Sequence, residues 1–265
     1  MIEGSGSSGV VGVCRTGVLR RAVLCGLFLQ LAATAYGFKL SPMVQVLEPS
    51  GRGASAVFHV ESDSDQQVTV EISMAKRVVD GDGKESTLPE EDNFSVYPSQ
   101  ILLDPKKTQA VRVRWLGDAR PKSELAYRII AEQLPVSLTK EDRGARINLV
   151  VRYIGSVYVV PKGVKADVVL EAVSEEAGGE SGRKLAIVLR NQGTAHALLD
   201  NLEVDVTANG GEGDGRTSVH LTQAGLKGID SENILAGHTR RFVIPWPQGL
   251  GRGPLELKFK FDQPK

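Results

Sequence analysis

The sequence predicts an all-β fold made of two antiparallel β-sandwiches. From Phe38 onward, apolar and polar residues alternate with a period of two, which places successive side chains on opposite faces of a sheet. Clusters of glycine, proline, aspartate and serine interrupt this alternation at intervals of roughly 8 to 12 residues, the spacing typical of short strands in a sandwich. We find no convincing amphipathic helix in the same part of the chain.

The segment before these strands is predicted to be a secretory signal peptide, which we assign to residues 1–37. Three arginines are followed by an apolar run over residues 22–31 and by the small residues of "ATAYG", the three parts of such a signal. An uncleaved membrane anchor is the alternative, but the apolar run is shorter than the roughly 20 residues of a spanning helix. Cleavage would remove both cysteines, Cys14 and Cys25, so we expect neither a disulfide nor a thiolate metal site in the exported chain.

The first sandwich is predicted to occupy residues 38–161. Its strands are indicated by the stretches "SAVFHVES", "QVTVEISMAKRVV", "QAVRVRWLG", "LAYRIIAEQL" and "INLVVRYIGSVYVV". One of the turns, "DGDGKES" at residues 80–86, resembles the opening of a calcium loop, but Lys84 stands where a third carboxylate is needed. Because Asp-Gly pairs supply the positive φ of tight turns, a hairpin explains this stretch better.

The second sandwich is predicted to occupy residues 162–265. Pro161 ends the first series of strands, because proline cannot donate to a strand ladder. The second series consists of "KLAIVLRNQ", "DNLEVDVTAN", "RTSVHLTQ", "HTRRFVIPWP" and "PLELKFKFD". The acidic, glycine-rich stretches "SEEAGGESGR" and "NGGEGDGR" are interpreted as hairpin loops between these strands.

Charge and motifs argue against several classes of function. The 32 lysines and arginines balance the 32 aspartates and glutamates, whereas nucleic-acid binding needs a basic surplus or a clustered basic face. The four histidines have neither HxxxH nor HExxH spacing, and neither a GxSxG nor a GxxxxGK[ST] motif is present. We therefore expect no enzymatic activity, no metal or other cofactor and no nucleic-acid partner.

One predicted strand, within residues 147–160, is unusually long and apolar. Counting by twos gives an unbroken apolar row, and the residues between its members form a mixed row. The apolar row consists of Ile147, Leu149, Val151 and Tyr153. Periodicity alone favours a row that faces the core of its own sandwich. The alternative is a row held beside an exposed edge for strand addition, in which main-chain hydrogen bonds give affinity and alternate side chains fill pockets on the partner.

Several segments, taken in order, resemble the PapD-like periplasmic chaperones of pilus assembly. "VYPSQILLDPKKTQAVRVRW" resembles the family's strand-turn-strand, "AYRIIAEQLP" the following strand, and "INLVVRYIGSVYVVPKG" the donor strand and linker. In the second half, "KLAIVLRNQGTAHALLDNLEV" resembles the strand, Asn-rich turn and strand of the family's second domain. The resemblance covers nearly all of the chain after the signal peptide and implies two immunoglobulin-like β-sandwich domains.

The resemblance implies a chaperone of the periplasm that binds pilus subunits by donor-strand complementation before they reach an outer-membrane usher. By position, Ile147, Leu149 and Val151 would be the donated row and Tyr153 its extension. An exposed donor edge would also allow self-association. The competing interpretation is a secreted structural or adhesive β-sandwich protein of the cell surface.

The sequence departs from the family at the two carboxylate anchors. Family members usually hold the subunit's terminal carboxylate with an arginine on the first strand and a lysine on the donor strand; the corresponding positions here are Val44 and Ser156. A shifted alignment would let Lys39 or Arg152 supply the charge. A divergent member would use backbone amides and hydroxyls such as that of Ser156, and a third interpretation is that the fold is kept and client binding is lost.

Overall fold

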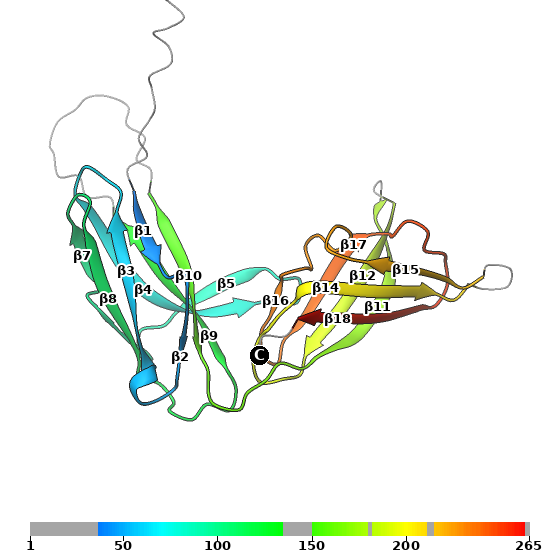
Figure 1. Cartoon of the computed structure of the whole chain (residues 1–265), viewed down its shortest axis with the longest axis horizontal. Coiled ribbons are helices and arrows are strands. Elements are labelled where there is room, and N and C mark those ends of the chain that lie inside the picture. The colour runs from blue at the N-terminus through cyan, green and yellow to red at the C-terminus, as the bar shows by residue number, and fades with distance from the viewer. Residues whose placement is uncertain (1–36, 135–149, 180–181, 211–214, 263–265) are drawn as a thin grey trace, which may run out of the picture. The chain divides into compact units, whose positions relative to one another are not determined.

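The computed structural model describes residues 37–134, 150–179, 182–210 and 215–262. Apart from one 3-10 turn, η1 (Arg52–Ala54), the regular structure in these residues consists of strands. The strands form two sandwiches (Figure 1), and each has its own hydrophobic core, which confirms the predicted all-β class of two immunoglobulin-like domains. Within these residues, no helix is long and apolar enough to cross a membrane.

The first sandwich packs a four-stranded sheet against a six-stranded sheet. The four-stranded sheet has the order β1 (Phe38–Ser41), β3 (Ser55–Ser62), β8 (Thr108–Trp115), β6 (Phe94–Tyr97). The other has the order β2 (Val44–Leu47), β10 (Arg152–Val159), β9 (Leu125–Gln133), β4 (Val68–Val79), β5 (Glu85–Pro89), with β7 (Gln100–Leu103) also paired to β4. The alternating stretches of the sequence therefore become β3, β4, β8, β9 and β10.

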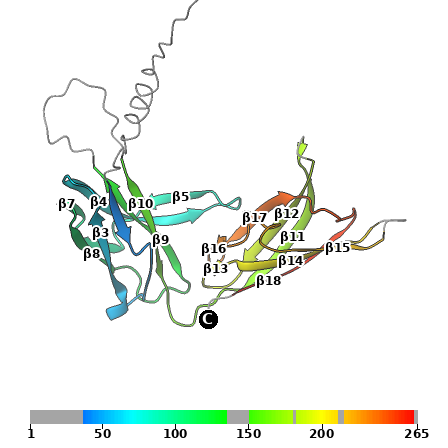
Figure 2. The ribbon, with the colours of Figure 1, turned by 45° about the horizontal axis from the view of Figure 1, so that its top comes forward.

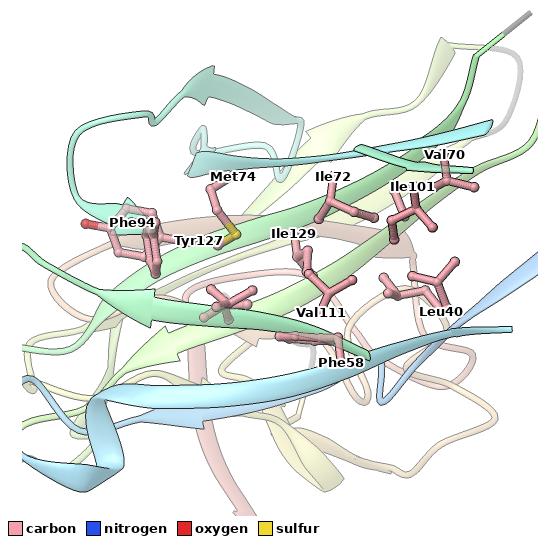
Figure 3. Close-up of a cluster of buried hydrophobic side chains, with 14 of the residues drawn as sticks. Leu40, Phe58, Val70, Ile72, Met74, Phe94, Ile101, Val111, Tyr127 and Ile129 are labelled. Atoms are coloured by element: carbon pink, nitrogen blue, oxygen red, sulfur yellow. The ribbon is translucent and has the colours of Figure 1, made fainter. Parts of the chain in front are cut away.

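Alternation buries one face of each sheet in a shared core. Figure 3 shows Phe58 and Val111 of the four-stranded sheet directed toward Ile72 and Ile129 of the six-stranded sheet. Phe58, Val111 and Ile129 have no exposed surface, and Ile72 is 3% exposed. At roughly 1.5 to 3 kcal/mol for each large apolar side chain that is fully buried, this core is the main source of stability in a domain without cysteine.

The β4–β5 hairpin contains residues 80–86, the stretch that resembles the opening of a calcium loop. β4 and β5 pair from Ala75↔Pro89 to Val79↔Glu85, and the side chain of Asp80 accepts hydrogen bonds from the backbone of Asp82 and Lys84. Asp80 thus closes the turn itself, as a short polar side chain commonly does. Among the residues that the structure describes, no group of acidic, histidine or cysteine side chains could hold a metal ion.

The second sandwich consists of two three-stranded sheets and a short pair. The sheets have the orders β11 (Val168–Ala177), β12 (Arg183–Asn191), β17 (Thr239–Pro245) and β15 (Thr217–Leu221), β14 (Asp200–Ala208), β18 (Leu255–Asp262), and β13 (Ala197–Leu198) pairs with β16 (Asn233–Ile234). The predicted boundary between residues 161 and 162 lies in the connection from β10 to β11, and it stays a prediction.

One loop assignment in the second sandwich is wrong. "SEEAGGESGR" was expected to be a hairpin loop, but its first four residues continue β11 and pair with Arg183 to Ala186 of β12. The acidic residues are compatible with a strand because this is an edge strand with exposed side chains, and Glu175 forms an ion pair with Arg183. The connection between the two strands is therefore confined to residues 178–182.

Candidate functional site

Strand β10 has one fully paired edge and one half-open edge. It pairs with β9 along its whole length, from Arg152↔Glu132 to Val159↔Leu125 (Figure 2). On its other side it pairs with β2, in parallel, from Ser156↔Val44 to Val159↔Leu47. In the part of the chain that the structure describes, no strand pairs with this side over residues 150–155. We call this segment the open edge.

The open edge exists because the first strands change sheets. β1 pairs with β3 of the four-stranded sheet, whereas β2, which follows after Pro42 and Met43, pairs with β10 of the other sheet. The crossing requires a glycine in β10: a Cβ atom on Gly155 would lie only 3.0 Å from the carbonyl oxygen of Met43 and 2.9 Å from a methyl group of Ile129. Gly155 thus allows the chain to join β10 halfway along its length.

Alternate residues of the open edge direct their backbone groups away from β9. The amide of Gln133 donates to the carbonyl of Val151 (2.9 Å), and the amide of Ser156 donates to the carbonyl of Met43 on the opposite side (2.7 Å). Because successive residues of a strand direct their backbone groups to alternate sides, the N–H and C=O groups of Arg152 and Ile154 face the open edge. No residue that the structure describes pairs with them, so they are suited to an incoming strand.

Exposed apolar side chains lie beside the open edge on the outer face of the six-stranded sheet. Four of them, which we call the outer patch, are Val44 (57% exposed), Val46 (59%), Val150 (46%) and Ile154 (43%). The sequence analysis missed this patch because β2 has four residues, too few to show a period, and because Val150 and Ile154 belong to the mixed row.

The row singled out in the sequence lies on the opposite face. Val151 and Tyr153 are half-buried and pack against the core, and the ring of Tyr153 contacts that of Phe38 edge-on with centroids 5.3 Å apart. Ile147 and Leu149 lie outside the described residues. The structure therefore places the described half of the row against its own sandwich.

The three candidate anchors are not brought together. Lys39 lies on β1 of the four-stranded sheet, where its ammonium is 2.7 Å from Asp63; this hydrogen bond raises the pKa of Lys39. Arg152 and Ser156 lie on the outer face of β10, and Arg152 pairs with Glu132 at 3.2 Å. Both ion pairs are about half exposed, so they contribute little stability.

Sequence reasoning missed an ionic cluster beside Ser156. Arg128 of β9 donates to the hydroxyl of Ser156 and to Glu85 of β5, and Arg77 of β4 also donates to Glu85. Burial alone would raise the pKa of Glu85, but the hydrogen bond from Arg128 and the charge of Arg77 outweigh burial and hold this pKa below its ordinary value. Only cross-strand register unites the three residues, and a sequence read strand by strand does not show it.

Part of the chain matches a known protein family. Residues 46–165 match the family model of the pili and flagellar-assembly chaperone PapD amino-terminal domain. No curated protein matches the chain in sequence.

Solved structures share the fold. The chaperone–tip subunit complex CsuC–CsuE from the archaic chaperone-usher Csu pili of Acinetobacter baumannii matches with a TM-score of 0.56 at 14% identity, over 83% of this chain and 97% of the other. A chaperone–tip adhesin complex of CFA/I fimbriae biogenesis matches with a TM-score of 0.52 at 17% identity, over 86% and 99%. The class 5 fimbriae chaperone CfaA matches with a TM-score of 0.50 at 18% identity, over 85% and 100%.

These structures establish the shared fold, and the family match covers the domain that carries the open edge. Residues 46–165 are thus similar to the amino-terminal domain of the PapD pilus-assembly chaperones, and the chain shares the fold of the fimbrial chaperone structures.

Proposed function

We propose that this protein is a pilus-assembly chaperone that binds pilus subunits by donor-strand complementation at the open edge of β10. The observation that carries the proposal is the half-paired strand: β2 covers residues 156–159, whereas the backbone groups of Arg152 and Ile154 face outward. An incoming strand that bonds to these groups would gain main-chain hydrogen bonds, and its side chains would alternate between the two faces of the sheet.

The outer patch supplies apolar contact next to these hydrogen bonds. Each of its four side chains still exposes about half of its surface. Full burial of a Val or Ile side chain is worth roughly 1.5 to 3 kcal/mol, so covering the remaining surface of four would contribute on the order of 3 to 6 kcal/mol. This is a useful fraction of an association cost of about 4 to 15 kcal/mol.

The row of Ile147, Leu149, Val151 and Tyr153 has two parts in this proposal. Val151 and Tyr153 pack on the core and hold β10 in place. Ile147 and Leu149 continue the row in sequence, beyond the described residues, and would enter the groove of the subunit. The row would then be core at Val151 and Tyr153 and donor strand at Ile147 and Leu149.

The wider setting follows from the same proposal. The chaperone would act in the periplasm after export by its signal peptide, pass the subunit to an outer-membrane usher, and do so without catalysis. Structures that resemble this chain are complexes of chaperones with tip subunits, which supports pilus subunits as the partners. Without a client, the open edge of one copy would be free to pair with that of another.

Co-purification from the periplasm tests the proposal. The full chain, tagged at its carboxyl terminus, would be expressed with pilus subunits of the same organism, in the wild type and in the variants Val150→Asp and Ile154→Asp. The matched control is Val57→Asp, because Val57 is similarly exposed (38%) on the other sheet. We expect a subunit to be captured by the wild type and the control and lost with the two edge variants. Equal capture by all four proteins would refute the open edge as the binding site.

A further inference from the structure

The tip of the β4–β5 hairpin contacts the second sandwich. We call residues 80–83 the hairpin tip. The backbone amide of Arg241, on strand β17, donates to the carbonyl of Gly81 at 2.6 Å, and the guanidinium of Arg241 lies 3.2 Å from the carboxylate of Asp82. Within the described residues, β17 is an edge strand that pairs with β12 alone. The hairpin tip therefore bonds to a backbone donor that no strand of the second sandwich uses.

The hairpin tip takes its shape from contacts inside the first sandwich. The side chain of Asp80 accepts hydrogen bonds from the amides of Asp82 and Lys84 at 3.1 and 2.8 Å, and the amide of Gly83 donates to the carbonyl of Asp80 at 3.0 Å. Gly83 has a φ of 88°, in the left-handed region that favours glycine. Because these contacts are local, the tip is ordered before it meets β17, and the contact costs little further conformational entropy.

A buried arginine of β17 packs against Gly83. The side chain of Arg240 is 7% exposed, and its two Nη atoms donate to the carbonyl of Asn233 at 3.0 Å and to Glu232 at 3.2 Å. A Cβ atom on Gly83 would lie 2.1 Å from Nη2 of Arg240, a distance at which the atoms collide. Because both Nη atoms are tethered to acceptors, the guanidinium cannot move aside without losing these bonds. The site accepts the hairpin tip only with glycine at residue 83.

The contact also leaves one polar group unsatisfied. Nε of Arg240 is buried and has no acceptor among the residues that the structure describes, and a buried donor without an acceptor costs free energy. The ion pair of Arg241 with Asp82 is 39% and 75% exposed, so it adds little stability. The contact thus depends on one backbone hydrogen bond and on the fit around Gly83, and a small perturbation is enough to open it.

Direct contacts connect this site to strand β10. Asn233, whose carbonyl accepts from Arg240, donates through its side chain to the hydroxyl of Tyr158 at 3.2 Å. The ring of Tyr158 stacks on that of His196 with centroids 4.3 Å apart, and Tyr158 also packs with Leu235. Tyr158 belongs to β10, the strand that carries the open edge. The residues that receive the hairpin tip are therefore also those that hold the second sandwich against β10.

We propose that the hairpin tip is a releasable strap between the two sandwiches. Closed on Arg240 and Arg241, the strap fixes the second sandwich against β10; open, it lets the two sandwiches reorient. The feature that carries this inference is the close approach of Gly83 to a buried, tethered guanidinium that keeps one unsatisfied nitrogen. Opening gives that nitrogen access to water and costs the Gly81 hydrogen bond, so few contacts separate the two states. The strap belongs to the chain alone and does not depend on the proposed function.

Residual dipolar couplings of the full chain in one alignment medium test the strap. Two sandwiches tied by a closed strap share one alignment tensor, whereas sandwiches that reorient have two. We expect one tensor in the wild type and two in Gly83→Ala, whose added methyl group collides with Arg240. The matched control is Gly51→Ala, because Gly51 also has a positive φ (75°) but a Cβ atom there meets nothing within 4 Å. The control carries the same kind of backbone strain and should keep one tensor.

A second substitution separates the collision from a general loss of structure. In the double variant Gly83→Ala, Arg240→Ala the colliding guanidinium is absent, the amide of Arg241 can again reach Gly81, and the common tensor should return. The backbone amide spectrum of each variant would show whether both sandwiches are folded. Two tensors in the wild type, one tensor in folded Gly83→Ala, or two in the folded double variant would each overturn the strap.

Discussion

The substitution Ile154→Pro should weaken strand addition at the open edge and leave the protein folded. The amide of Ile154 points toward the open edge, because the amide of Ser156 reaches Met43 on that side and the carbonyl of Val151 accepts from Gln133 on the other. Ile154→Pro therefore removes a donor that the β9–β10 ladder does not use. Proline is tolerated on edge strands under this condition, and the residue before it, already in a strand, has the extended conformation that proline requires.

The expected loss can be worked from one hydrogen bond. A partner strand paired with β10 would bury a carbonyl against residue 154, and a buried carbonyl left without a donor costs about 1 to 3 kcal/mol. Each 1.4 kcal/mol is a factor of ten in affinity, so subunit binding should weaken by roughly 5-fold to 150-fold. The loss of apolar contact is smaller, because only the 43% of Ile154 that is exposed in the free protein can be covered by a partner.

Titration of a purified subunit into labelled chaperone, read by fluorescence anisotropy, would measure the loss. The control is Ile154→Ala, which keeps the amide and removes most of the side chain. Urea unfolding of both variants would establish that they are folded under the conditions of the assay. If Ile154→Pro is folded and binds no more weakly than Ile154→Ala, main-chain pairing at residue 154 is not part of the interface, and the assignment of the open edge is wrong.

Three further predictions concern stability, each read by urea unfolding. Asn191 is fully buried, accepts hydrogen bonds from the amides of Asp167 and Gly193, and donates to two backbone carbonyls. Asn191→Leu should lower the free energy of unfolding by about 2 to 4 kcal/mol, because these backbone groups lose their partner. A loss smaller than that caused by replacing an exposed asparagine would contradict this role. Phe58→Ala should cost about 3 to 5 kcal/mol and Val57→Ala, half-exposed on the same strand, about 1 kcal/mol or less. Because the pKa of folded Glu85 lies below its ordinary value of 4.5, its stabilising effect is present above that pH and is lost as the pH falls through the folded-state pKa; the pH dependence of stability between pH 6 and 3 should be shallower in Glu85→Gln.

The strands that the sequence predicts are those with enough residues to show alternation. β3 has eight residues and coincides with "SAVFHVES", and β4, β8 and β9 follow their stretches within one or two residues. Four strands, β1, β2, β6 and β7, have only four residues each. Alternation over four residues is just two repeats, and such a short pattern often arises by chance. The acidic end of β11 is predicted as a loop because its glycine-rich, acidic composition outweighs an alternation that edge strands show only weakly.

The candidate site could be predicted only in part, because its residues are united by register between strands distant in sequence. The sequence locates β10 as the strand of interest, but which of its rows faces outward depends on how it pairs with β9. The outer patch joins residues 44 and 154, and the cluster of Arg77, Arg128 and Glu85 joins three strands. The pattern within one strand carries no information on which residues of other strands lie beside it.

The open edge must pair with a client and yet not with every other edge, and its side chains show how both conditions can be met. Edge strands are commonly protected by charge, by short length or by cover from another segment. Here β2 covers half of β10, and Arg152, paired with Glu132, stands in the middle of the open half between Val150 and Ile154. In an antiparallel pair of two such edges, with Arg152 opposite its own copy, two like charges would meet, which is destabilising. A client strand with a neutral or acidic residue at that position meets no such repulsion.

Because the repulsion between two copies of Arg152 would be removed, we expect Arg152→Val to increase self-association of the free protein, measured by sedimentation velocity. If Arg152→Val remains as monomeric as the wild type at the same concentration, the charge does not protect the edge, and cover by β2 alone must suffice.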